Sequence, residues 1–293
     1  MNFLERLKDY DEDCCWQYHI RLKNYEEDVG EIGLTEEEIK KLRVSDFHFE
    51  FVEDRKERTK MTNFIKRHEW LGTLSQYTTH WFACYYKKTL AGVILFNLPN
   101  TFSKMMGEGT KEIERLISRG ACISWSPKNL ASSFLMWCIG YMVKNTRYRL
   151  FTAYSDPSAR ELGTIYQACN FYYIGQKSGT LLKFVSPYTG KIVSDRYFRQ
   201  KTSYKKYAKE MGIEWGKDWN HSKGMNWHNM PKETELKLRA CAKEKQKLSK
   251  KVESPAKHKY AYVLGITKKE TKELRKKFEK RNTTYPYPKE RLL

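Results

Sequence analysis

Hydrophobic and polar positions follow two different periods along the first 200 residues. In FHFEF, Phe47–Phe51, the three phenylalanines occupy every second position, which predicts a strand with one buried face. In RKERTKMTNFIKRHEWLG the larger side chains recur instead at helical spacing, at Met61, Phe64, Ile65 and His68. HWFACYYKKTLAGVILF then predicts two strands joined by a turn at Lys87 and Lys88, and therefore a hairpin.

The same reading predicts strand, helix and strand over the next segments. EIERLISRGACISW indicates a strand, SPKNLASSFLMWCIGYMVKN a long buried helix, and YRLFTAYS a further strand. Asp156 is a good N-cap and Pro157 suits the first helical position, so we expect a short helix to open there and to close at Tyr166. The strands FYYIG and TLLKFV are expected to complete the core.

This order of elements predicts an α+β or α/β fold with a mixed, mostly antiparallel sheet and helices on both faces. Composition divides the chain further. Residues 1–45 form an acidic helical lead-in, with the capping-box pattern TEEE at Thr35, and residues 46–200 form the core. Residues 201–256 are a basic insertion rich in Trp and Lys, and residues 257–293 add a strand, a basic helix and a tail.

Charge is distributed unevenly within the net +20. Residues 1–60 carry 11 basic and 17 acidic groups, whereas residues 201–293 carry 26 basic and 11 acidic groups. The C-terminal third therefore suits a polyanion such as nucleic acid, and its alternative is a solvated basic surface. Candidate DNA-binding residues are Lys243, Lys245, Lys247, Lys250 and Lys251, together with Trp215, Trp219 and Trp227. The tryptophans either stack on bases or form a small local core.

Cysteine usage and hydropathy indicate the compartment. No apolar run reaches the length of a membrane span, and the N-terminus is too polar for a signal peptide. Seven cysteines without a CxxC pair indicate reduced thiols, so we expect a cytoplasmic protein without a membrane partner.

Several stretches together resemble a known family. EIERLISR, the helix start PKNLASSFL, YSDP and GTIYQACNFYYIG are similar to the phage Mom DNA-modification proteins over roughly residues 60–190. The resemblance implies a GNAT acyltransferase-like fold and an enzyme that adds a carbamoylmethyl group to the N6 amine of adenine in DNA. It further implies a bacteriophage protein that acts in a bacterial cytoplasm and protects phage DNA from restriction.

The resemblance also implies site residues. Arg115, Asp156 and Tyr166 fall on positions that the family uses in its active site, as does Ser132 or Ser133. His68 falls near a family histidine linked to iron, although Glu69 follows it here where the family usually has an aromatic residue. Asn129, Ser132 and Ser133 open the long helix, where the fold holds its group donor. KNLASS lacks the usual glycines, which argues against acetyl-CoA and leaves the donor unidentified.

The chemistry of adenine suits these residue types. Its exocyclic amine is conjugated with the ring, so a carboxylate such as Asp156 would orient the N–H and take the proton. Arg115 would stabilise negative charge on the donor, and Tyr166 would protonate the leaving group. In double-stranded DNA the amine is stacked and paired, so the reaction calls for base flipping.

Each of these residues also has a purely structural interpretation. The alternatives are an N-cap at Asp156, a core aromatic at Tyr166, an ion pair at Arg115 and a satisfied core histidine at His68, with helix packing by the two serines. Two alternative functions follow: a CoA-dependent N-acyltransferase acting on a small-molecule or protein amine, and a non-catalytic DNA-binding protein on a GNAT scaffold.

Overall fold

A computed structural model describes residues 14–99, 103–176, 180–190, 192–221 and 224–289. The helices are α2 (Trp16–Ile32), α3 (Glu36–Lys41), α4 (Arg55–His68), α5 (Thr110–Ile113), α6 (Leu130–Asn145), α7 (Thr164–Ala168), α8 (Lys201–Glu210), α9 (Lys232–Leu248) and α10 (Lys268–Arg281). The longer strands are β1 (Phe47–Phe51), β2 (Thr78–Tyr86), β3 (Thr89–Asn97), β4 (Glu114–Cys122), β5 (Leu150–Ser155), β6 (Tyr172–Gly175), β7 (Thr180–Val185), β11 (Lys251–Pro255) and β12 (His258–Val263).

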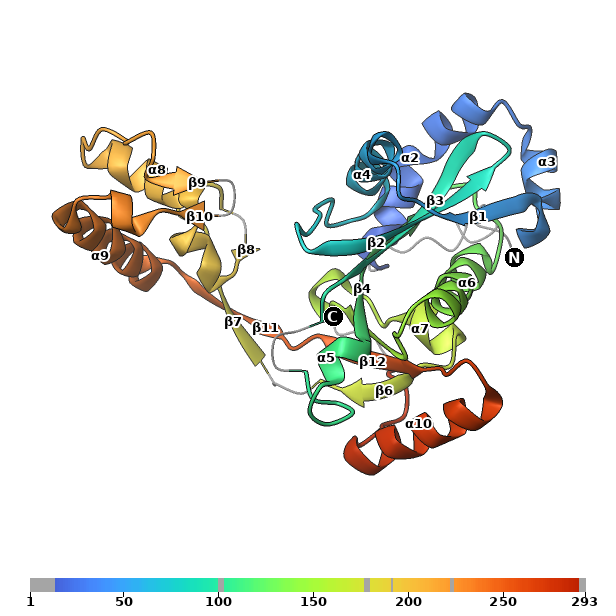
Figure 1. Cartoon of the computed structure of the whole chain (residues 1–293). Helices are drawn as coiled ribbons and strands as arrows, with labels where there is room; N and C mark the ends of the chain where they lie inside the picture. The colour runs from blue at the N-terminus through green and yellow to red at the C-terminus, as the bar shows by residue number, and fades with distance from the viewer. Residues whose placement is uncertain (1–13, 100–102, 177–179, 191, 222–223, 290–293) are drawn as a thin grey trace. The chain divides into compact units, whose positions relative to one another are not determined.

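The main sheet has seven strands in the order β1-β2-β3-β4-β5-β12-β6. All neighbours are antiparallel except β4 and β5, which are parallel and are connected through α6. Figure 1 shows α2 and α4 over one side of this sheet and α6 over the other. The prediction of a mixed, mostly antiparallel sheet with helices on both faces is confirmed.

Local signals in the sequence placed several elements correctly. Lys87 takes a left-handed φ of 51° in the β2–β3 turn, where Tyr86 lies opposite Thr89. Thr35 caps α3 through the expected capping box with Glu38. The alternating phenylalanines of β1 face α6, since Phe49 stacks on Phe134 with ring centroids 4.9 Å apart.

The segment after β5 differs from the expected single helix. Asp156 caps a 3-10 turn, Pro157–Ala159, by accepting a hydrogen bond from the Ser158 amide at 3.0 Å. The helix α7 starts later, after Gly163, which has a φ of 70°. Left-handed residues interrupt a right-handed helix, so Arg160 (φ 57°) and Gly163 separate the turn from α7.

The strand TLLKFV lies outside the main sheet, which corrects the prediction that it completes the core. This strand, β7, pairs with β11 and β8 (Ile192–Val193) in a separate three-stranded sheet. The position beside β6 is taken by β12, which comes more than 80 residues later in the chain. Neighbours in sequence usually pair, and nothing local in TLLKFV signals this exception.

The chain divides into two compact units, one of residues 1–177 with 257–293 and one of residues 178–256. The change in composition predicts that the insertion starts at residue 201. The second compact unit begins at residue 178 instead, because β7 pairs with β11. The second unit has a hydrophobic cluster of its own, centred on Tyr204, Tyr207 and Leu238. Within the described residues, no helix is long and apolar enough to cross a membrane.

Candidate active site

A cavity of about 560 Å³ lies in the first unit, where β4 and β5 separate. The two strands pair in parallel only from Glu114 opposite Leu150 to Ile117 opposite Ala153. Beyond that point β4 stays with β3 and β5 stays with β12. Two parallel strands that diverge leave a gap that side chains and loops must line, and the end of β4, the end of β5 and the start of α6 surround it.

The lining combines charged and aromatic side chains from segments far apart in sequence. They are Tyr18 and Arg21 of α2, Glu69 and Trp70 after α4, Arg119 of β4, Lys128 and Asn129 before α6, Ser132 of α6, Tyr154 of β5, Asp156, Glu161, Tyr166 of α7, and Lys257. Of the predicted catalytic and donor-binding residues, the structure therefore brings Asp156, Tyr166, Asn129 and Ser132 to one cavity.

Asp156 follows the last residue of β5 and is 7% exposed. One carboxylate oxygen, Oδ1, caps the turn at Ser158, and the other, Oδ2, lies 3.1 Å from Nζ of Lys257. The expected capping role is thus present. The same carboxylate also lines the cavity, so capping and chemistry are compatible in this side chain.

Tyr166 contributes a phenol to the cavity from α7. Its ring packs between Phe171 and Tyr260, with centroids 5.4 and 5.3 Å away. Burial, reinforced by the negative charge of Glu161, raises the pKa of Tyr166 well above its usual value of 10. The phenol is protonated at neutral pH, as an ordinary tyrosine is, and its raised pKa makes it a weaker acid.

Two carboxylates in the cavity were missed by sequence analysis. Glu69 accepts hydrogen bonds from the amides of Leu71 and Gly72, at 3.0 and 2.8 Å. Glu161 accepts one from Nε1 of Trp70 at 2.8 Å. Burial raises the pKa of both carboxyl groups. A lone acidic residue in a loop has no periodic pattern that would mark it as part of a site. The one feature of the sequence that pointed to Glu161 is its position between Asp156 and Tyr166.

Residues at the start of α6 line the cavity. Asn129 precedes the helix with a φ of 69°, a conformation that favours glycine and that asparagine tolerates better than most residues. The loop KNLASS thus reaches a left-handed turn without glycine. Ser132 lines the cavity while its hydroxyl donates to the Asn129 carbonyl at 3.0 Å, whereas Ser133 is not among the lining residues. A helix start of this kind suits an anionic ligand.

Arg115 lies outside the cavity lining. It sits on the paired part of β4, opposite Phe151, two positions before the strands separate. Its guanidinium stacks on the ring of Tyr148 at 3.7 Å, donates to the Tyr148 hydroxyl and donates to the Glu114 carbonyl at 2.7 Å. The structure therefore shows Arg115 in packing contacts and does not bring it to Asp156 and Tyr166.

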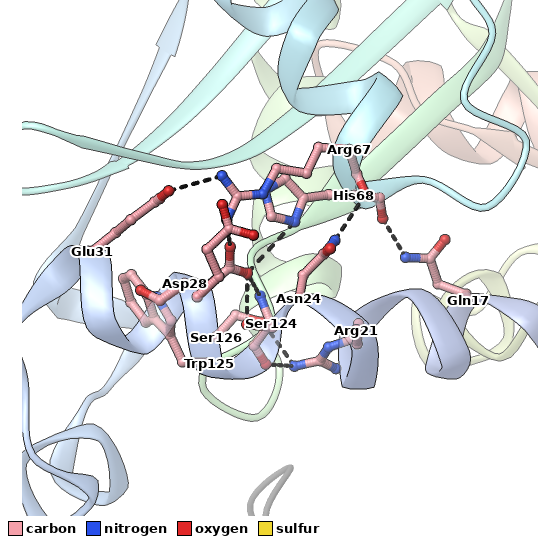
Figure 2. A network of polar contacts seen from close by, with 11 residues as sticks. Gln17, Arg21, Asn24, Asp28, Glu31, Arg67, His68, Ser124, Trp125 and Ser126 are labelled. Carbon is pink, nitrogen blue, oxygen red and sulfur yellow. Dashed lines mark hydrogen bonds and ion pairs between the residues drawn. The ribbon is translucent and has the colours of Figure 1, made fainter.

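His68 belongs to a buried polar network between α2 and α4, shown in Figure 2. Nδ1 of His68 lies 3.6 Å from Oδ2 of Asp28, which also accepts from the Ser124 hydroxyl at 2.6 Å. Arg67 donates to the other Asp28 oxygen at 2.6 Å. Burial lowers the pKa of His68 to about 4, so the ring is neutral at physiological pH.

The surroundings of His68 decide whether an iron centre fits. No three His, Cys, Asp or Glu side chains come together as metal ligands anywhere in the part of the chain that the structure describes. The Asp28 carboxylate is already used by Arg67 and Ser124. The described residues around His68 do not fit a metal centre, so no step of the chemistry is derived through one.

In the second unit, the three tryptophans pack against the local hydrophobic cluster. Trp215 and Trp219 make an edge contact with centroids 5.6 Å apart, and Trp227 lies edge-on to Tyr204 at 4.9 Å. Among the five candidate lysines, Lys245 pairs with Glu210 at 2.8 Å, and the other four side chains, Lys243, Lys247, Lys250 and Lys251, are exposed. The unit carries 18 basic and 8 acidic residues, a net charge of +10.

Comparison with protein families gives one match. The profile of the Mom protein family matches residues 50–217, which is more than half of the chain. The matched segment contains the predicted catalytic residues and all of β4, α6 and β5. No curated protein sequence matches the chain.

Similar solved structures include three acetyltransferases. The ribosomal-protein-S5-alanine acetyltransferase of Vibrio fischeri is 13% identical over 45% of this chain and 62% of that chain, with a TM-score of 0.28. A Bacillus subtilis acetyltransferase in complex with CoA is 9% identical over 74% of this chain and 99% of that chain, with a TM-score of 0.34. The spermidine N-acetyltransferase of Vibrio cholerae, in complex with CoA and spermine, is 11% identical over 45% and 86%, with a TM-score of 0.34.

Proposed function

The chain belongs to the Mom protein family, and from that premise we propose that it is a transferase that adds a carbamoylmethyl-type group to the N6 amine of adenine in DNA. The observation that carries the proposal is the meeting of Asp156 and Tyr166 in one cavity beside the start of α6. The biological consequence would be protection of phage DNA from restriction in the host cytoplasm.

The proposed reaction needs a proton acceptor and a proton donor in one cavity. As N6 forms its bond to the methylene carbon of the incoming group, the bond from that carbon to the donor's leaving group breaks. The Asp156 carboxylate takes the proton that N6 loses. Tyr166, whose phenol is protonated at neutral pH, gives its proton to the leaving group.

The α6 start would bind the donor. Backbone amides at a helix N-terminus favour negative charge, and Lys128, Asn129 and Ser132 line this part of the cavity. An anionic or strongly polar donor suits these groups. Asn129 provides the left-handed turn for which the usual loop has glycine. The absence of glycines from KNLASS therefore does not rule out acetyl-CoA as the donor.

Double-stranded DNA is the proposed acceptor. Its adenine amine must leave the base stack to reach a cavity lined by buried carboxylates, at a cost of roughly a few kcal/mol. Binding of the flanking phosphates by a basic surface would offset that cost. The second unit, with its net charge of +10, would supply such a surface. The packing of the three tryptophans supports a local core for them, so the lysines are the stronger DNA-binding candidates.

Mass spectrometry of nucleosides tests the proposal directly. DNA from cells that express the protein should contain a 2′-deoxyadenosine derivative, heavier than 2′-deoxyadenosine by the transferred group less the hydrogen it replaces, and the Asp156→Asn variant should not produce it. Unmodified adenine together with acetylation of a small-molecule or protein amine would favour the alternative, a CoA-dependent N-acyltransferase. Tight DNA binding without any transfer would favour a non-catalytic DNA-binding protein.

A further inference from the structure

Glu161 forms hydrogen bonds with Asp156 and Trp70, which both line the cavity. It lies in the short stretch between the turn Pro157–Ala159 and α7. Its Oε1 accepts the indole N–H of Trp70 at 2.8 Å, and its Oε2 accepts the backbone N–H of Asp156 at 3.1 Å. Its own amide donates to the Asp156 carbonyl at 3.2 Å. Asp156 is therefore held by Glu161 through both its backbone N–H and its carbonyl.

Trp70 extends this connection to α2. Its backbone N–H donates to the side-chain oxygen of Gln17 at 3.1 Å, and its ring makes an edge contact with Trp16 at 5.3 Å. The Glu161 carboxylate thus joins the loop after β5 to the segment after α4, and Trp70 joins that segment to the first turn of α2. Each of the two carboxylate oxygens of Glu161 accepts an N–H from a residue of the cavity wall.

The conformation of the loop explains why such a contact is needed. Arg160 adopts a left-handed φ of 57°, which is unfavourable for a residue with a side chain. The bond from the Asp156 N–H to Glu161 closes the loop across this position. Without it, the direction of the Asp156 side chain would depend on the Ser158 cap and on Lys257 alone among the contacts described above.

We propose that Glu161 is a positioning residue, which fixes the Asp156 carboxylate and the Trp70 indole in the cavity through its two hydrogen bonds. The effect on modification rests on the proposed function, whereas the two hydrogen bonds do not. Neither Glu161 nor Trp70 is among the residues that the family resemblance singled out.

Charged groups around Glu161 determine how it titrates. The charges of Glu69, after α4, and Asp156, after β5, act on Glu161. Glu161 in turn acts on Tyr166 of α7, and Lys257 pairs with Asp156. Burial, followed by the charges of Glu69 and Asp156, raises the pKa of Glu161, while its hydrogen bonds oppose that shift. Protonation of Glu161 should therefore begin above the pH at which an exposed glutamate titrates.

Nuclear magnetic resonance of the full chain tests both hydrogen bonds without any donor molecule. The Trp70 indole signal, assigned by its loss in Trp70→Phe, should titrate together with the Asp156 backbone amide, with a midpoint above pH 4.5. In Glu161→Gln both signals should move and stop titrating. The matched control is Glu112→Gln, which neutralises an exposed glutamate of α5 and should leave both signals unchanged.

The cellular assay adds the functional consequence. Glu161→Gln should lower the modified fraction of adenine by about 100-fold, because small misplacement of a reacting group has effects of this size. Its melting temperature and its affinity for duplex DNA should stay at the wild-type values. Full modification by Glu161→Gln would overturn the proposal. If the wild-type chain modifies no adenine, the proposed function fails, and the positioning role of Glu161 is then tested by the Trp70 indole and Asp156 amide signals alone. If these two signals are the same in Glu161→Gln and wild type, Glu161 does not position either group, whether or not adenine is modified.

Discussion

At the scale of single residues, the two oxygens of Asp156 have separate tasks. Oδ1 caps the turn at Ser158, and Oδ2 pairs with Lys257, whose side chain is 45% exposed. Asparagine retains the capping oxygen and loses the basicity. Asp156→Asn should therefore lower DNA modification by at least about 100-fold, while the free energy of unfolding changes by only about 1 kcal/mol or less, as for other half-exposed ion pairs. Nucleoside mass spectrometry and urea unfolding give the two values, and an active Asn variant would remove Asp156 from the chemistry.

Tyr166 allows a similar separation of packing from proton transfer. Tyr166→Phe retains the ring between Phe171 and Tyr260 and removes only the hydroxyl. If the phenol protonates the leaving group, modification should slow by about 100-fold or more. The stability should change little. An unchanged rate of modification, followed over time after induction, would leave Tyr166 as a packing residue.

His68 makes stability depend on pH. Its pKa is about 4 in the folded chain and about 6.5 in an unfolded one, because burial disfavours the charged ring. The unfolded chain therefore binds the extra proton between these values, and stability is lost as the pH falls from 6.5 toward 4. The contribution of this group between pH 7 and pH 5 is about 2 kcal/mol.

Urea unfolding at the two pH values, in wild type and in His68→Gln, isolates that contribution. The variant should lose less stability between pH 7 and pH 5 than the wild type does. The partly buried ring of His80 also has its pKa lowered to about 4, chiefly by burial, so the stability of the variant should still depend on pH to some extent. Equal losses in both proteins would mean that the His68 ring is not held neutral by its burial.

At the scale of elements, α7 depends on the glycine before it. Gly163 has a φ of 70°, and a Cβ there would lie 2.5 Å from Cε2 of Tyr260. Gly163→Ala should cost roughly 1–2 kcal/mol for the backbone conformation and about 1–3 kcal/mol for the displaced ring. It should also reduce DNA modification, since α7 carries Tyr166. Gly140→Ala is the control, because its Cβ would meet nothing within 4 Å and alanine favours the interior of α6. A Gly163→Ala variant as stable as wild type would contradict this account.

The helix α9 and the strand after it carry the lysines proposed to bind DNA. Each phosphate neutralised contributes about 0.9 to the slope of log affinity against log salt. Neutralising Lys243, Lys245, Lys247, Lys250 and Lys251 together should flatten that slope and weaken binding to all sequences alike. Lys245 already pairs with Glu210, so the other four should account for most of the change.

Fluorescence anisotropy with a labelled duplex over a range of salt concentrations measures this slope. The matched control neutralises five exposed lysines of the acidic N-terminal segment, Lys23, Lys40, Lys41, Lys56 and Lys60, and should leave the slope unchanged. The adenines chosen for modification should be the same in both variants. A slope that the first set leaves unaltered would place the DNA away from α9.

How far the sequence predicts these elements depends on where their partners lie. The β2–β3 hairpin, α6 and the cap of α3 follow from neighbouring residues, and all three were predicted. The departure of β7 from the main sheet was not, because its partner β11 lies far along the chain. In the site, Asp156 and Tyr166 stand on a recognisable motif, whereas Glu161 acts through contacts with Trp70 that no local pattern encodes. Arg115 could be placed only once the point where β4 and β5 separate was known.

At the scale of the whole molecule, the second unit is inserted in the chain between β6 and β12, which are neighbours in the main sheet. The antiparallel pairing of β7 and β11 places Thr180 opposite Pro255, so the inserted unit begins and ends at the same place. The long excursion in the sequence is thus closed by two paired strands. This closure lowers the entropy that β12 loses on entering the sheet, since its effective loop is much shorter than the sequence separation.

The interior position of β12 also sets an order of events during synthesis. A ribosome adding about 5–20 residues per second needs roughly 4–16 s to make the 79 residues of the inserted unit. Throughout that time β5 and β6 have been synthesised, and the strand that separates them in the finished sheet does not yet exist. The nascent chain therefore carries two open strand edges, which are templates for pairing with other chains. A chain released before β12 is made keeps those edges and lacks Tyr260, the ring against which Tyr166 packs. Incomplete copies should therefore aggregate and should be inactive for the same structural reason.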